Sequence, residues 1–211
     1  MPHYEDKYHG FVHKNLLENS QYYQFRAKYA SKIYWKYLKG KVLEFGAGLG
    51  QNIFLHKDTA EGVDVSDFSI DFCKKKGIKV TKNIKKIKDN TFDSILSVHC
   101  LEHLENPSGT LKELYRILKP SGRLLLVLPV SGKNKPFKNF KSNVAKHLFS
   151  WNFSHINELL TLNDFKVRLN KFNYSYGYSI FYKFNFTLAL FLLKFLGKLK
   201  NKKEMVVLAE K

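Results

Sequence analysis

The sequence predicts an α/β protein with a doubly wound, mostly parallel sheet. Three observations support this fold class: apolar, strand-like segments alternate with segments that suit helices, a glycine-rich loop follows the first strand, and 211 residues suit a single domain over residues 1–211. Strands that alternate with helices pair in parallel, because each crossover helix covers one face of the sheet. Ligands of such sheets bind at the carboxyl ends of the strands, so the residues that follow each early strand matter most for function.

The first half of the chain alternates between the two element types in a regular order. Gly40 and Gly77 are helix stop signals, because glycine readily adopts the left-handed conformation that ends a helix. Ser66 and Asp67 are both residue types that cap the start of a helix. The expected elements are an aromatic-rich helical segment over 15–38, a strand over 41–45, a helix from about residue 51, a strand over 62–65, a helix that ends at Gly77, and a weak strand over 78–80.

The second half contains the two clearest strands. Residues 92–98 are apolar on both faces, as a buried parallel strand requires, and residues 123–128 form a strongly apolar run. Pro107 suits the first turn of a helix, and Ser154 can cap another helix. The other expected elements are a helix from Pro107 to Leu118, a turn over 119–122, a helix from Ser154 to about Asn163, a strand over 165–172, an apolar segment rich in lysine, and a last strand over 205–209.

Composition indicates a folded protein of a reducing compartment. The chain is 44% hydrophobic and 26% charged, which is a globular composition. Its two cysteines, Cys73 and Cys100, are too few for a disulfide framework and predict free thiols. The N-terminus lacks the pattern of a secretory signal, and no stretch of 18 residues is free of charge. We therefore expect a cytoplasmic protein without a transmembrane helix.

The net charge is strongly positive, at +18 from 36 basic and 18 acidic residues. A field of this sign favours anionic partners such as nucleic acid, acidic lipid or phosphorylated metabolites. The alternative is a lysine-rich, solvated surface with no specific partner. Only four of the basic residues are arginine, the side chain that binds phosphate with two parallel hydrogen bonds. Charge alone does not decide between the two interpretations.

The glycine loop after the first strand is the most informative feature. In Gly46, Gly48 and Gly50 the last interval is one residue shorter than in the dinucleotide fingerprint. Glu44 precedes the loop and would repel a pyrophosphate, but its charge suits a ligand with an ammonium or sulfonium group. Asp64 ends the next strand, where a carboxylate can accept both hydroxyls of a ribose. A tight turn that needs glycine only for packing is the alternative.

These motifs resemble those of the class I S-adenosylmethionine-dependent methyltransferases. Four segments carry the resemblance, within roughly residues 22 to 170 and the last strand: Val42–Gly50, Gly62–Ser66, Asp89–Leu96 and Leu111–Pro129. The resemblance implies a Rossmann-like, doubly wound, seven-stranded, mostly parallel sheet with an antiparallel last strand, and S-adenosylmethionine as the cofactor. Within one methyltransferase domain we expect an N-terminal helical lid over 1–40, a donor-binding core over 41–173, an apolar, basic insertion over 174–203 and the last strand over 204–211.

The resemblance also implies which residues bind the methyl donor. Asp64 would hold the ribose, and Asn83 is the nearest match to an Asp that the family places near the adenine amino group. In related O-methyltransferases an arginine at the offset of Arg26 grips the donor's carboxylate. An arginine that a surface helix keeps in solvent is the alternative for Arg26. The expected donor-binding residues are Arg26, Glu44, Gly46, Ala47, Gly48, Gly50, Asp64, Val65, Asn83, His99 and Cys100.

The segment after the fourth strand is where the donor and the methyl acceptor should meet. His99 and His103 are the candidate catalytic residues, because histidine titrates near neutrality and can take a proton from a hydroxyl acceptor. If the segment is helical, His99, Glu102 and His103 share one face. The segment resembles the Glu-x-x-Glu-His motif that ubiquinone-type O-methyltransferases associate with a divalent metal. His99 replaces the first Glu and disfavours magnesium, so we assign no metal site. The open alternatives are a softer metal on these three residues, or surface histidines beside a helix-capping Glu.

Four aromatic residues of the N-terminal segment, Tyr8, His9, Tyr22 and Tyr23, suit either a lid over the site or ordinary packing. His147 and His155 come shortly before the C-terminal apolar segment and are candidates for lining an acceptor pocket.

Residues 183–203 are apolar and basic at once, with six lysines and no acid. A basic helix with Phe and Leu on its other face suits the interface of an anionic membrane, which here would be the inner face of the cell membrane. A helix that packs on the sheet or on a dimer partner is the alternative. Membrane contact would favour a lipid-linked acceptor, such as a prenylated quinone or a glycolipid intermediate.

The sequence therefore predicts an S-adenosylmethionine-dependent methyltransferase that methylates a small-molecule or lipid-linked acceptor at oxygen, by in-line displacement. The alternative is a non-catalytic or RNA-directed member of the fold that uses its basic surface to bind RNA or a membrane. A nucleic-acid partner is supported by charge alone. The Asn/Asp-Pro-Pro-Tyr/Phe motif, with which the family methylates nucleobase amines, does not follow the fourth strand.

Overall fold

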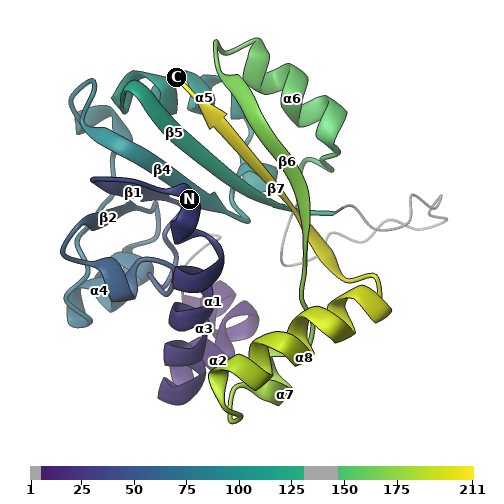
Figure 1. Ribbon diagram of the computed structural model, residues 1–211. Coiled ribbons are helices and arrows are strands. Elements are labelled where there is room, and N and C mark those ends of the chain that lie inside the picture. Colours follow the sequence, from purple (N-terminus) through teal and green to yellow (C-terminus); the bar gives the residue numbers. More distant parts are fainter. Residues whose placement is uncertain (1–5, 131–146) are drawn as a thin grey trace, which may run out of the picture.

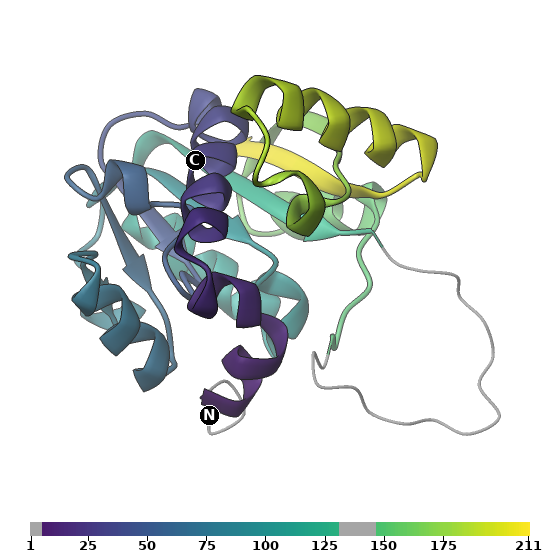
Figure 2. The ribbon, with the colours of Figure 1, turned by 90° about the horizontal axis from the view of Figure 1, so that it is seen from below.

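The computed structural model of the protein describes residues 6–130 and 147–211 and contains one seven-stranded sheet with helices on both faces (Figures 1 and 2). The strand order is β3-β2-β1-β4-β5-β7-β6, and β7 runs antiparallel to both of its neighbours while the other pairs are parallel. The predicted fold class is thus confirmed. The strands are β1 (Val42–Phe45), β2 (Ala60–Val63), β3 (Val80–Thr81), β4 (Phe92–Val98), β5 (Leu118–Pro129), β6 (Lys166–Tyr174) and β7 (Lys203–Glu210).

The helices form two layers around this sheet. The α-helices are α1 (Asp6–Val12), α2 (Lys14–Glu18), α3 (Ser20–Ile33), α4 (Asp67–Lys75), α5 (Pro107–Ile117), α6 (Phe153–Thr161), α7 (Tyr178–Phe181) and α8 (Phe186–Leu199). Single 3₁₀ turns are η2 (Trp35–Tyr37), η3 (Phe54–His56), η4 (Ile84–Lys86) and η5 (Leu101–His103).

Alternation along β5 divides the core between the two faces of the sheet. Leu124 and Leu126 are fully buried in the cluster that α5 and α6 contribute to. Leu125 and Val127 are fully buried in a second cluster with residues of α3 and α8. This two-residue period is what a strand covered on both faces requires. The N-terminal segment and the insertion before β7 therefore cover the same face of the sheet.

Several predicted element ends are confirmed because local signals set them. Strand β4 has the predicted bounds. The side chain of Ser66 caps α4 by accepting a hydrogen bond from the amide of Ser69. Gly77 follows this helix with a φ of 70°, which suits glycine at a helix end.

The helix predicted from about residue 51 is wrong: turns and η3 fill this segment. The carbonyl of Asn52 accepts a hydrogen bond from the indole of Trp35, and its side chain donates to Glu44. These contacts hold Asn52 outside a helical hydrogen-bond pattern. The loop is thus fixed by tertiary contacts that the local sequence does not reveal.

Two further predictions need correction. The predicted turn at 119–122 lies inside β5, where the register to β4 shifts and Ser121 has a φ of 59°. Asn152, not Ser154, caps α6 by accepting a hydrogen bond from the amide of His155. In the first case the irregular residues are part of the strand, and in the second the helix begins earlier than expected.

The expected helical segment over 15–38 is divided into shorter pieces. Asn19 ends α2 and caps α3 by accepting a hydrogen bond from the amide of Tyr22. Among the described residues, no helix is long and apolar enough to cross a membrane.

Candidate functional site

The loop after β1 lies at the carboxyl end of the sheet. Together with Asp64 we call this loop, residues 46–50, the cradle. Gly46 and Gly48 have φ angles of 75° and 52°, which favour glycine. The amides of Gly46 and Ala47 donate to the carbonyl of Val63 and so attach the loop to β2. A Cβ at Gly46 would collide with Sγ of Cys100, whereas a Cβ at Gly48 would meet nothing within 4 Å. Gly46 is therefore required by packing, while the backbone at Gly48 borders open space.

Asp64 lies at the end of β2 with its carboxylate held against this loop. One oxygen accepts a hydrogen bond from the amide of Gly48 at 2.7 Å, and the other accepts from the amide of Ser66 at 2.9 Å. Each carboxylate oxygen has a second lone pair that remains available. The arrangement suits a ligand with two neighbouring hydroxyls, such as a ribose.

Glu44 lies in β1 and is completely buried. Its Oε1 accepts a hydrogen bond from the amide of the Asn52 side chain at 2.6 Å, and its Oε2 has no partner among the described residues. Burial raises the pKa of Glu44 to about 8, with a smaller contribution from the charge of Asp64. An added positive charge nearby would favour the ionised form of this carboxyl group.

Arg26 extends from α3 into an aromatic environment. Its guanidinium lies 4.3 Å from the ring centre of Tyr178, and Nη1 donates to the hydroxyl of Tyr22 at 3.4 Å. Burial alone would lower its pKa, but the two tyrosines raise it above the usual value. Its Nε is buried without a hydrogen-bond partner, and within the described residues no carboxylate forms an ion pair with it. A ligand carboxylate would accept a hydrogen bond from this Nε and pair with the charge of the guanidinium.

The remaining predicted donor-site residues differ in their environment. Val65 is 46% exposed directly after Asp64, and Ala47 is buried in the loop. Asn83 caps η4 through a hydrogen bond from the amide of Lys85, so its side-chain oxygen already has one donor. Burial raises the pKa of Cys100, which leaves its thiol protonated beside Gly46.

The N-terminal segment packs on the cradle. The hydroxyl of Tyr23 donates to the carbonyl of Leu49 in the glycine loop at 2.8 Å. His9 is buried, lies 2.9 Å from the hydroxyl of Ser69, and stacks on Phe68. These contacts suit a lid and ordinary packing equally, so the lid stays a prediction; residues 1–5 lie outside the described residues.

His99 follows β4 with a φ of 50°, and its side chain points to the start of β7. Its Nε2 lies 3.0 Å from Oε2 of Glu204, and Oε1 of the same carboxylate accepts hydrogen bonds from the side chains of Tyr34 and Asn173. Burial would lower the pKa of His99, but the hydrogen bond to Glu204 and its charge raise it. Glu204 therefore fixes the orientation of the imidazole.

The expectation that His99, Glu102 and His103 share one helical face is wrong in one respect. The helical turn η5 begins only at Leu101, and the positive φ of His99 sets it apart from that turn. Oε1 of Glu102 nevertheless lies 3.9 Å from Nδ1 of His99 and 3.8 Å from Nε2 of His103.

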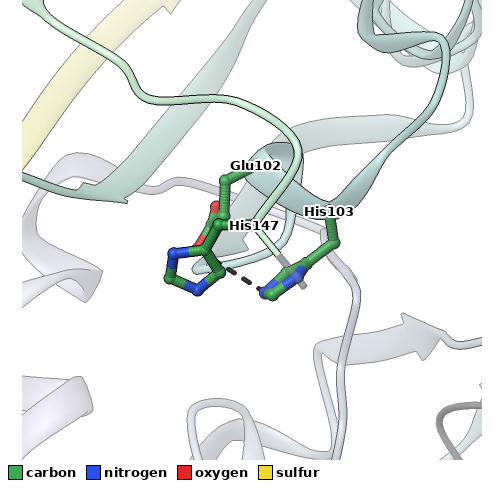
Figure 3. A group of neighbouring side chains, drawn as sticks. All are labelled: Glu102, His103 and His147. Atoms are coloured by element: carbon green, nitrogen blue, oxygen red, sulfur yellow. Dashed lines mark ion pairs between the residues drawn. The ribbon is translucent and has the colours of Figure 1, made fainter. Parts of the chain in front are cut away.

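A second histidine cluster lies beside η5 (Figure 3). Glu102, His103 and His147 each offer a ligand atom, and these atoms all lie within 4.8 Å of one another. His99 is not a member of this group, so His147 takes the position that the softer-metal alternative gave to His99. His155 lies elsewhere, on α6 beside Asn152.

Glu204 is the residue that sequence reasoning missed. It is the only acid between Asp164 and Glu210, in a segment otherwise rich in lysine, and this isolation was an available signal. Its contact with His99 joins residues 105 positions apart, so no local pattern predicts it. The same holds for Tyr178, which lies over Arg26.

Known proteins resemble this chain in sequence and in fold. Residues 43–126 match the family described as "Methyltransferase domain". An uncharacterized protein of Methanocaldococcus jannaschii is 33% identical over 137 residues, which are 64% of this chain and 56% of that protein. The chain thus spans little more than half the length of this curated relative.

Two solved structures share the fold over nearly the whole chain. A protein of Thermotoga maritima, described as an SAM-dependent methyltransferase and possible histamine N-methyltransferase, superposes with a TM-score of 0.68 at 19% identity and covers 97% of both chains. A Burkholderia thailandensis 1,6-didemethyltoxoflavin-N1-methyltransferase with bound S-adenosylhomocysteine has a TM-score of 0.61 at 16% identity, over 96% of this chain and 84% of that one.

Proposed function

We propose that this chain is a class I S-adenosylmethionine-dependent methyltransferase and that it transfers a methyl group from S-adenosylmethionine to a small-molecule or lipid-linked acceptor; the match of residues 43–126 to the methyltransferase domain and the shared fold support this. The observation that carries the proposal is the cradle itself. Gly48 borders open space while its amide holds the carboxylate of Asp64 at the carboxyl end of the sheet. The residues present fit the donor. The carboxylate of Asp64 suits its ribose, the open space at Gly48 leaves room for it beside the backbone, and Arg26, which has no carboxylate partner among the described residues, suits its carboxylate.

Three groups of the chain would hold the donor. Asp64 accepts the ribose hydroxyls, the backbone at Gly48 leaves room for the ligand, and Arg26 pairs with the carboxylate. When bound, the donor supplies a methyl group on a positively charged sulfur. The protein then contributes alignment, exclusion of water by the N-terminal segment, and removal of the acceptor's proton.

His99 is the proposed base, which makes oxygen the proposed site of methylation. Its Nε2 is engaged by Glu204, whereas its Nδ1 lies 3.9 Å from Oε1 of Glu102, beyond hydrogen-bond distance, so Nδ1 is the nitrogen proposed to take the acceptor's proton. A hydroxyl acceptor must lose its proton as the new bond forms, whereas the donor supplies the driving force. His103 lies on the adjacent turn and is the second candidate for positioning the acceptor.

A calorimetric titration with S-adenosylhomocysteine tests the donor site. Two hydrogen bonds to a charged carboxylate contribute about 1.5–3 kcal/mol each, so Asp64→Ala should weaken binding by at least about 100-fold. Asp71→Ala removes an exposed carboxylate from α4 and should bind like the wild type. A folded wild type that does not bind S-adenosylhomocysteine would refute the proposed function.

The acceptor that we favour is lipid-linked, because of the outer face of α8. Ala189, Leu193 and Gly197 lie on the buried side of this helix. Phe191 lies on its exposed side and is 64% exposed. The exposed large apolar residues of this region are Ile180, Phe184, Leu188, Phe191, Phe195 and Leu199. Lysines without a single acid accompany them, so the surface suits the interface of an anionic bilayer.

Vesicle flotation tests this surface. Binding to phosphatidylglycerol-containing vesicles should exceed binding to phosphatidylcholine vesicles, because each nearby lysine contributes about 1 kcal/mol. Phe191→Glu should abolish the binding, while Leu162→Glu, at a residue with 78% exposure at the end of α6, should retain it. Equal loss in both variants would contradict a specific membrane surface.

A further inference from the structure

The carboxylate of Glu102 is buried without a hydrogen-bond donor among the described residues. Its side chain is 0% exposed, and neither of its oxygens has a hydrogen-bond partner among the described residues. The histidine nitrogens of the two ion pairs lie at 3.9 and 3.8 Å, beyond hydrogen-bond distance. A buried carboxylate without a hydrogen-bond donor is unfavourable, and a cation that lies closer to it than the two imidazoles would offset this.

Backbone contacts bring a second imidazole to this carboxylate. The carbonyl of Glu102 accepts hydrogen bonds from the amides of Leu148 and Phe149, which fixes the segment before α6 against η5. His147 directly precedes these residues, and its ring lies 4.8 Å from the ring of His103 in an edge-to-face arrangement. Figure 3 shows the carboxylate and both rings gathered around one space.

We propose that Glu102, His103 and His147 bind a divalent transition-metal ion of the zinc type. Two imidazoles and one carboxylate are a ligand set of catalytic zinc sites, in which a fourth position stays open. Magnesium is disfavoured, because it prefers oxygen ligands in octahedral geometry. The ligand atoms lie within 4.8 Å of one another. Bonds of about 2.0–2.1 Å would bring them to roughly 3.4 Å, a contraction that the exposed side chain of His147 can supply.

The proposed role of the ion rests on the proposed methyl transfer. Glu102 lies 3.9 Å from the proposed base, His99, so an ion held by Glu102 would lie near the proposed acceptor side of the site. A hydroxyl oxygen bound to the ion would lose its proton at a lower pH, which prepares it for methylation. Binding of the ion itself depends only on the three ligands.

Cobalt(II) is the probe for this site, because its visible absorption reports tetrahedral coordination. After treatment with a chelator and dialysis, the wild type should bind one equivalent of cobalt(II) with visible bands, and zinc should displace it. His147→Ala and Glu102→Gln should each weaken cobalt binding by about 100-fold or more, since even outer contacts of metal ligands contribute 10–100-fold. His155→Ala, which removes a histidine outside the cluster, should leave the spectrum unchanged.

Two results would overturn the proposal. One is an absorption spectrum that His147→Ala leaves intact. The other is a spectrum lost in His99→Ala, because His99 contacts Glu204 and lies outside the proposed ligand set. Titration of the same variants with S-adenosylhomocysteine separates this question from the donor site. Retained donor binding without cobalt binding refutes only the metal site, and the reverse outcome refutes only the proposed methyl donor.

Discussion

Replacement of Arg26 by methionine tests the donor site most sharply. The guanidinium lies over the ring of Tyr178, its Nε is buried without a partner, and it forms no ion pair within the described residues. If it binds the carboxylate of the donor, the charge-assisted hydrogen bonds contribute about 1.5–3 kcal/mol. At 1.36 kcal/mol for each factor of ten, Arg26→Met should weaken S-adenosylhomocysteine binding by about 10- to 150-fold.

The stability of the free protein should change little in this variant. Loss of the contact with Tyr178 costs about 0.5–2 kcal/mol, whereas removal of a buried unpaired donor recovers about 1–3 kcal/mol. Arg116→Met is the matched control, because that guanidinium forms ion pairs with Asp89 and Glu113. The control should lose stability and keep its affinity for S-adenosylhomocysteine.

A ligand without the carboxylate completes the test. Methylthioadenosine shares the nucleoside and the sulfur but lacks the amino acid, so calorimetry should find equal affinities for it in wild type and Arg26→Met. The carboxylate assignment fails if S-adenosylhomocysteine affinity falls less than about threefold, or if methylthioadenosine binding weakens as much as S-adenosylhomocysteine binding does.

Three further predictions concern the same region. Glu204→Gln removes the charge that raises the pKa of His99, so the acidic limb of the pH–rate profile should move to lower pH; an unmoved limb would point to another base. Because the pKa of Glu44 is raised to about 8, the free energy of unfolding of the wild type should fall as pH rises from about 5 to 8, and urea titrations of Glu44→Gln should lack this fall. Gly48→Ala should cost only about 1–2 kcal/mol of stability but block S-adenosylhomocysteine, whereas Gly46→Ala should unfold the protein because its Cβ has no space; equal melting temperatures for the two would contradict this.

Local sequence signals were enough to predict several strands and the glycine loop, whereas the seven-stranded sheet with its antiparallel last strand followed from the family resemblance. The apolar run over residues 92–98 became β4 with the expected bounds, and Ser66 and Gly77 mark the two ends of α4. The three glycines all have positive φ angles, as their spacing suggested. These features depend on residues close together in the chain, where propensity and periodicity apply.

Contacts between distant residues explain what could not be predicted. The indole of Trp35 donates a hydrogen bond to the carbonyl of Asn52, in the segment where a helix was expected after the glycine loop. Glu204 reaches His99 only because β7 lies between β5 and β6, and His147 joins η5 only through backbone hydrogen bonds to Glu102. The residues of the proposed base and of the proposed metal site can be read in the sequence. Which of them lie in contact depends on the order of the strands and on the path of the chain.

The central position of β7 has a consequence for the orientation of the proposed base. The cradle is complete once β1 and β2 are paired, within a short stretch of chain. His99 meets Glu204 only after β7 has inserted between two strands that precede it in sequence. The orientation of the proposed base, His99, therefore depends on the last strand of the sheet, whereas the hydrogen bond between Gly48 and Asp64 joins only residues that follow β1 and β2. A change that disturbs β7 should alter the surroundings of His99 and leave the Asp64 contact in place.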